Sequence, residues 1–186
     1  MQAEKEAPSQ TKSIVRELAE TIIFTLLLYV LIRTFLFENY RVLGHSMDPT
    51  LENEQFLVVN KLGYRLSDPE RGDIIVFRDP RTDERKLIKR VVGLPGEMLE
   101  IQEGQVLINS QHLDEGYIAA KGRYSQAPRL IAEGEYFVLG DNRNNSSDSH
   151  NWGMLPRDKI IGKAWISYWP PRLWGLIPHE NYGSVP

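Results

Sequence analysis

Three short segments of this chain carry side chains suited to nucleophilic chemistry. The first is the turn at 44–51, GHSMDPTL, where Ser46 follows the end of a predicted strand. A serine on such a turn can present its hydroxyl at the strand end, with backbone amides nearby to hold a developing oxyanion. The alternative is an ordinary serine in a β-turn, because serine and proline are common turn residues.

The second segment, KLIKRVV at 86–92, places Lys89 in an otherwise mostly apolar predicted strand. Side chains alternate between the two faces of a strand, so Leu87 and Val91 share the face of Lys89. A buried ammonium is costly unless it is paired or loses its proton, and burial lowers a lysine pKa by up to about 3–5 units. Lys89 is therefore a candidate general base, and the alternative is an edge-strand lysine that reaches solvent.

The third segment is the polar loop GDNRNNSSDSHN at 140–151. Its composition is typical of a solvated loop. The spacing of Asp141 with Arg143, and of Asp148 with His150, also suits a buried polar network. In such a network the hydroxyl of Ser146 can orient an amine.

Composition excludes several other chemistries. The chain has 186 residues and no cysteine, which excludes thiol nucleophiles, cysteine-ligated zinc and iron–sulfur clusters. Its four histidines are dispersed, and it has neither an HExxH motif nor a glycine-rich phosphate loop, so we expect no metal and no cofactor. A net charge of −3 gives no basic field for nucleic acid. A Ser–His–Asp triad of Ser46, His150 and Asp148 is a weaker alternative, because the last two lie only two residues apart.

The sequence after residue 38 predicts a mainly β scaffold for these segments. Short apolar runs alternate there with turn-forming proline and glycine pairs, and no long helical period occurs. We predict a β-barrel or sandwich-like domain over 38–186, with a longer excursion at about 114–133. The predicted strands are 40–43, 56–60, 73–77, 86–92, 97–101, 105–109, 135–139 and 160–169.

The N-terminal part is different. Residues 1–13 are polar and predict a flexible tail, whereas residues 14–37 are mostly apolar and reach about 36 Å as a helix, enough to cross a bilayer. No small-x-small cleavage site follows, so we predict an uncleaved anchor. A cleaved signal sequence and an amphipathic or buried helix are the alternatives. Basic residues flank both ends, so charge alone does not set the orientation.

Four sequence boxes follow the apolar segment in order: GHSMDPTL (44–51), RGDIIVF (71–77), KRVVGLPGE (89–97) and GDNRNNSSDS (140–149). Together they resemble the type I signal (leader) peptidases, membrane-bound serine proteases with a Ser–Lys dyad, over about residues 14–170. The resemblance implies a mainly β catalytic domain on the extracytoplasmic side of the cell membrane, behind a single N-terminal transmembrane helix and a cytoplasmic tail. It also implies cleavage of signal peptides after small residues at −3 and −1. The implied partners are preproteins that carry signal peptides, membrane lipid and a nearby secretion translocon.

The resemblance also assigns roles to individual residues. It implies Ser46 as the nucleophile, Lys89 as the general base and Ser146 as the serine that positions the lysine amine. The implied supporting polar residues are Asp148, Asp141, Arg143 and Arg90. The implied substrate pocket consists of Val42, Gly44, Met47, Leu87 and Ile88.

Three residues depart from the family pattern. Gly44 stands where some members carry a serine whose hydroxyl helps to hold the oxyanion, His150 replaces a usual arginine, and Asn144 replaces a frequent aspartate. Losing one oxyanion donor can cost about 10²–10³ in rate, so we expect another donor or a water to compensate. The alternative functions are a self-cleaving Ser–Lys protease and a membrane-tethered β domain that binds partners without catalysis.

An aromatic cluster near the C-terminus has two interpretations. Trp165, Trp169, Trp174, Leu176 and Ile177 lie among prolines. They belong either to the ordinary core or to an apolar surface that rests at the lipid interface.

Overall fold

The computed structural model of the chain describes residues 10–182. These residues fall into two compact units that separate between Phe37 and Glu38. Most of the predicted tail at 1–13 lies outside the described residues.

The first unit is the helix α1 (Gln10–Phe35). Its stretch Ile14–Phe35 is long and apolar enough, by length and composition, to cross a membrane. Arg33 lies in the last turn, where a cation interacts favourably with the helix dipole. The helix begins inside the predicted tail and ends two residues before the predicted boundary at 37.

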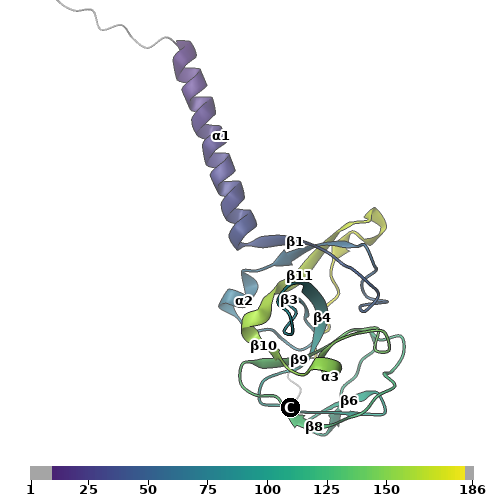
Figure 1. Ribbon diagram of the computed structural model, residues 1–186. Helices are drawn as coiled ribbons and strands as arrows, with labels where there is room; N and C mark the ends of the chain where they lie inside the picture. The colour runs from purple at the N-terminus through teal and green to yellow at the C-terminus, as the bar shows by residue number, and fades with distance from the viewer. Residues whose placement is uncertain (1–9, 183–186) are drawn as a thin grey trace, which may run out of the picture. The chain divides into compact units, whose positions relative to one another are not determined.

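The second unit is mainly β, as predicted, and its larger sheet has eight strands (Figure 1). Strands β2, β11, β3, β4 and β9 pair antiparallel in succession, β1 and β10 lie at the two ends, and β12 pairs with β11. The strands are β1 (Phe37–Arg41), β2 (Phe56–Asn60), β3 (Ile74–Arg78), β4 (Lys86–Gly93), β9 (Glu135–Leu139), β10 (Leu155–Pro156), β11 (Ile160–Trp169) and β12 (Gly175–Leu176).

A smaller sheet of four strands lies beside the larger one, below it in Figure 1. Its order is β7 (Gln111–His112), β6 (Gln105–Ile108), β5 (Met98–Gln102) and β8 (Gln126–Leu130). Short helices α2 (Gly63–Leu66) and α3 (Ser149–Trp152) and two 3-10 turns, Arg157–Lys159 and Pro171–Leu173, complete the unit. The predicted excursion at 114–133 thus contains one strand, β8.

The strand β4 takes part in all three apolar clusters of the core. Ile88 packs in the first, Val92 in the second, and Val91 with the partly buried Leu87 in the third. Burial of these side chains on both faces fixes the backbone of β4 within the core of this unit. The strand that carries Lys89 is therefore a rigid support.

Three predicted strands, 56–60, 135–139 and 160–169, coincide with observed strands. Those at 86–92 and 105–109 differ by one residue at one end, and those at 73–77 and 97–101 are shifted by one residue. The strand predicted at 40–43 is wrong in its bounds, because pairing as a regular strand ends at Arg41. Beyond that residue Val42 exchanges backbone hydrogen bonds with Gln55 and Glu54 of the following turn. These bonds hold the segment that leads into the 44–51 turn.

Candidate active site

The turn that carries Ser46 is anchored on the core from both sides. Met47 and Leu51 are buried in the first apolar cluster, and the Leu51 amide donates to the Met47 carbonyl at 2.9 Å. Gly44 has a φ of +91°, a conformation that favours glycine, and its amide donates to Asn53 Oδ1 at 2.8 Å. Ser46 itself stays partly exposed at the apex of this fixed turn.

The structure brings Ser46 and Lys89 into contact. Lys89 Nζ lies 2.6 Å from Ser46 Oγ, although the two residues are 43 positions apart in the chain. The amine also donates to the carbonyl of Ile88 at 2.7 Å. A serine hydroxyl within hydrogen-bond reach of an amine is the geometry of a nucleophile with its general base.

Burial changes the protonation of Lys89. Its side chain is only 3% exposed, and burial lowers its pKa from the usual 10.5 to about 8. Asp148 and Asp141 oppose this shift from a distance, and Arg85 adds to it. Within the described residues the amine makes no ion pair, so a substantial neutral fraction exists near pH 8.

Gly140 lets the polar loop approach the nucleophile closely. A Cβ at this position would lie 2.2 Å from Ser146 Oγ and 2.4 Å from the carbonyl oxygen of Ser46. Only glycine fits there. The Gly140 amide donates to Asp148 Oδ2 at 2.9 Å, which ties the two ends of the loop together.

Ser146 lies in the same region but does not bond to the lysine in this structure. Its Oγ is buried and has no hydrogen-bond partner among the described residues. The contact with the Lys89 amine that the resemblance implies is therefore not formed here. A buried hydroxyl without a partner is costly, so Ser146 is available to bond to a group that enters or moves.

Arg90 and Asp141 form a buried ion pair beside the dyad. Two guanidinium nitrogens of Arg90 donate to the two oxygens of Asp141, at 2.9 and 2.7 Å, and both side chains are almost wholly buried. The guanidinium also lies over the ring of Tyr117, 4.0 Å from its centre. This bidentate pair joins β4 to the start of the polar loop.

A second buried pair joins the loop to the segment that precedes β8. Arg143 donates to Glu115 through both terminal nitrogens, one of them at 2.9 Å, and its Nε donates to the Gly140 carbonyl at 3.1 Å. Tyr117 OH donates to Glu115 at 2.8 Å. Glu115 and Tyr117 are supporting residues that sequence reasoning missed, because nothing local distinguishes them from other polar residues of a loop.

Asp148 is the N-cap of α3 and has no exposed surface. Its Oδ1 accepts from the His150 amide and lies 2.6 Å from His150 Nδ1. The imidazole stacks on the ring of Tyr124 with 3.9 Å between centroids. His150 thus pairs with Asp148 while the dyad contact of Ser46 is with Lys89, which disfavours a Ser–His–Asp triad.

The five residues of the predicted substrate pocket do not all lie together in the structure. Val42, Met47 and Ile88 pack together in the first apolar cluster, each at most 3% exposed. Leu87 packs in the third cluster with residues of the opposite face of β4, and Gly44 is exposed. The three clustered side chains therefore shape the wall beside Ser46 mainly from behind its surface.

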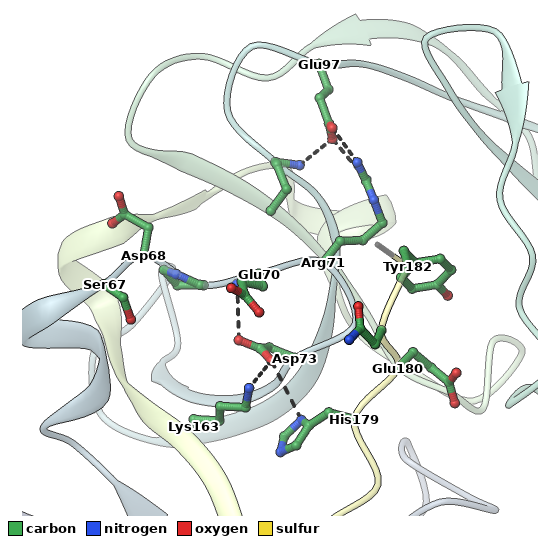
Figure 2. Close-up of a pocket in the computed structure, with 13 residues that line it drawn as sticks. Ser67, Asp68, Glu70, Arg71, Asp73, Glu97, Lys163, His179, Glu180 and Tyr182 are labelled. Atoms are coloured by element: carbon green, nitrogen blue, oxygen red, sulfur yellow. Dashed lines mark hydrogen bonds and ion pairs between the residues drawn. The ribbon is translucent and has the colours of Figure 1, made fainter. Parts of the chain in front are cut away.

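A polar cavity of about 900 Å³ is lined by residues of another part of the domain (Figure 2). Lys163 and His179 converge there on the buried Asp73, which also accepts from Tyr64 OH at 2.6 Å. His179 accepts from the Ile74 amide and contacts the Ala164 carbonyl, and burial with the charge of Lys163 lowers its pKa to about 4. These groups are mutually satisfied and tie the C-terminal segment to the sheet. Within residues 10–182 no group of three or more candidate ligands could hold a metal ion.

Comparison with known proteins defines the class. The family model described as "Signal peptidase, peptidase S26" matches residues 15–169. The chain therefore belongs to the signal peptidase family.

Individual relatives agree with this assignment. The chain is 44% identical to the signal peptidase I of Leptolyngbya laminosa, over 95% of this chain and 92% of the relative. It is 41% identical to the probable signal peptidase I-2 of Synechocystis sp., over 95% of this chain and 82% of the relative. Among solved structures, a signal peptidase I from Enterococcus faecalis V583 aligns with 52% of this chain and 97% of its own, at 32% identity and a TM-score of 0.45.

Proposed function

We propose that this protein is a membrane-anchored serine endopeptidase that removes N-terminal signal peptides from exported preproteins, with Ser46 as the nucleophile and Lys89 as the general base. The single observation that carries the residue assignment is the 2.6 Å contact between Ser46 Oγ and a buried Lys89 Nζ. Membership of the signal peptidase family supplies the substrate class.

Acylation begins with a neutral Lys89. Its amine takes the proton of Ser46 as Oγ attacks the scissile carbonyl carbon, so that a C–O bond forms and the carbonyl oxygen becomes an oxyanion. We assign the backbone N–H of Ser46 as a donor to this oxygen. The lysinium then protonates the leaving amine as the C–N bond breaks, which leaves the signal peptide esterified to Ser46.

Deacylation reverses these roles. A water attacks the ester carbonyl while Lys89 accepts one of its protons, and the collapse of the second tetrahedral intermediate returns the proton to Ser46 Oγ. The products are the signal peptide acid and the mature amine. Ser146 supports both halves by accepting a hydrogen bond from the amine, and the Asp148, Asp141, Arg143 and Arg90 network holds the loop in place.

Specificity for small residues follows from a closely packed wall. Val42, Met47 and Ile88 pack closely in the core behind Ser46, and a shallow wall of this kind accepts small side chains at −1 and −3 but not bulky ones. An extended substrate can add as a strand beside the turn. A preprotein with a large residue at −1 is cleaved poorly, and equal cleavage of the two preproteins would contradict this pocket.

The anchor places the enzyme beside its substrate. The apolar segment of α1, Ile14–Phe35, spans the cell membrane once, with the tail inside and residues 38–186 on the extracytoplasmic side near the secretion translocon. Trp165, Trp169, Trp174 and Leu176 are exposed by 41–74%, which suits contact with lipid. Activity of a fragment lacking residues 1–37 should rise with added lipid vesicles, and indifference to lipid would contradict this surface.

The direct test uses the full chain in detergent with a purified preprotein. Ser46→Ala and Lys89→Ala should each lower cleavage by at least about 10³-fold, because each removes a member of a unit that acts together. Ser147→Ala is the matched control, since Ser147 is an exposed serine of the polar loop at 140–151. Substantial cleavage by Ser46→Ala contradicts the mechanism, and cleavage of the enzyme itself without cleavage in trans favours the self-cleaving alternative.

A further inference from the structure

Asn142 holds the turn of the nucleophile by two hydrogen bonds that the mechanism above does not use. Its backbone amide donates to the Ser46 carbonyl at 3.0 Å. Its side-chain Nδ2 donates to the His45 carbonyl, also at 3.0 Å. One residue of the polar loop thus contacts two consecutive carbonyls at the reacting serine, from a position 97 residues away from His45.

The second of these bonds controls the orientation of the proposed oxyanion donor. The His45 carbonyl and the Ser46 N–H belong to the same planar peptide unit. In a trans peptide these two groups point in opposite directions, so a bond that fixes the carbonyl also fixes the N–H. With the carbonyl turned toward Asn142, the N–H of Ser46 points to the other side of the turn.

The orientation of the Ser46 N–H is important because Gly44 provides no side-chain donor to the oxyanion. Gly44 offers no hydroxyl to the oxyanion, and a Cβ on Gly44 would meet no atom within 4 Å. The backbone N–H of Ser46 therefore carries a larger share of the stabilisation than it would beside a second side-chain donor. The other contact to the His45 carbonyl, from the Asp48 amide, is long at 3.3 Å.

We propose that Asn142 is a positioning residue that aims the Ser46 N–H at the oxyanion through the His45 carbonyl. The proposal rests on the assignment of Ser46 as the nucleophile. Without the Asn142 bond the turn can rotate by a small angle, and the Ser46 N–H then points away from the oxyanion. Because the oxyanion develops only in the transition state, this affects the transition state more than the bound substrate. The expected loss is therefore in kcat, by about 10- to 100-fold, with KM changed by less than about twofold.

The test compares Asn142→Ala with Asn144→Ala in the full chain. Asn144 is a matched control in the same loop, because its side chain also bonds to backbone groups, but to Lys121 and Arg123 instead of the nucleophile turn. Asn142→Ala keeps the backbone bond to Ser46 and removes only the side-chain donor. If it fails to fold, Asn142→Asp is measured instead, since a carboxylate of the same size cannot donate.

A second readout separates positioning from a general structural role. A peptide aldehyde forms a tetrahedral adduct with a serine hydroxyl and puts its oxygen at the oxyanion position, whereas the matching peptide alcohol binds without it. Asn142→Ala should weaken inhibition by the aldehyde by about tenfold or more and leave inhibition by the alcohol and the midpoint of the pH profile unchanged.

Three results would overturn the proposal: a kcat within twofold of the wild type, an equal loss in Asn144→Ala, or equal weakening of both inhibitors. Failure of the proposed function is a separate result, because the unmodified enzyme would then not cleave the preprotein at all.

Discussion

Two lysines of the larger sheet lie side by side across one strand, but only one of them contacts a carboxylate. Lys89 of β4 and Lys163 of β11 are both register partners of Ile75 on the strand between them, so their side chains leave the same face. Lys163 ion-pairs with Asp73 in the polar cavity of Figure 2. Lys89 contacts a hydroxyl and a carbonyl instead and is more deeply buried.

The difference shows what converts a lysine into a base. Burial favours the neutral amine, and a carboxylate in contact favours the ammonium. Asp141 and Asp148 lie near Lys89, but Arg90 and His150 are their direct partners. The fold thus keeps the negative charges around the dyad paired with other groups, and the Lys89 pKa stays low.

Removing the Lys89 amine gives the largest expected effect. Lys89→Met should abolish cleavage, by at least about 10³-fold, and should also raise the free energy of unfolding. The folded pKa of about 8 lies below the usual 10.5, so the charged amine destabilises the fold at pH 7 by up to about 3 kcal/mol. The stability difference should shrink as pH rises from 8 to 10.5. Urea unfolding at several pH values checks this, and a less stable variant at pH 7 would contradict it.

The pH dependence of cleavage gives the next largest effect. Since only the neutral amine accepts the serine proton, kcat/KM should rise about tenfold per pH unit below 8 and level off above it. Between pH 6 and 8 this amounts to about 50- to 100-fold. A rate that is flat over this range would show that deprotonation of Lys89 does not limit the reaction.

Glu115→Gln tests the pair that sequence reasoning missed. The change leaves the buried Arg143 without its counter-charge and should cost about 3–5 kcal/mol of stability. Through the Gly140 contact it should also lower kcat, by about tenfold at a temperature where the variant is folded. Thermal unfolding and cleavage rates measure the two effects, and full activity in the folded variant would restrict Glu115 to a stability role.

Lys163→Met gives the smallest effect on activity and completes the comparison. The change removes an ion-pair partner of the buried Asp73 and should cost about 1–3 kcal/mol of stability. Cleavage should stay within twofold of the wild type. A large loss of kcat would show that the polar cavity and the dyad are coupled.

The sequence predicts the strands that are formed by clear apolar runs between turn-forming residues. The strands that carry or flank Lys89 have long apolar runs. The turn of Ser46 has Gly44 before the serine and Pro49 after it, and both residue types are typical of turns. The missed strands lack such patterns: β7, β10 and β12 have two residues each, and β8 is mostly exposed and contains Pro128. Their positions depend on partners far away in the chain.

The candidate site likewise has residues that local sequence patterns indicate and contacts that they do not. Ser46, Lys89 and the polar loop have local signals, and the resemblance joins them. The pairing of Arg143 with Glu115 and the stacking of Tyr117 on Arg90 arise only when folding brings distant segments of the chain together. Long-range pairs of this kind leave no spacing pattern in the sequence.

Direct titration of the Lys89 side chain tests the central claim, that burial lowers the pKa of this lysine enough to give a substantial neutral fraction near pH 8. NMR of the protein with 13C-labelled lysine side chains, assigned with Lys89→Met, follows the ammonium from pH 6 to 11. We expect a midpoint for Lys89 at about 8. A midpoint at or above 10 would mean that Lys89 stays charged and cannot activate Ser46.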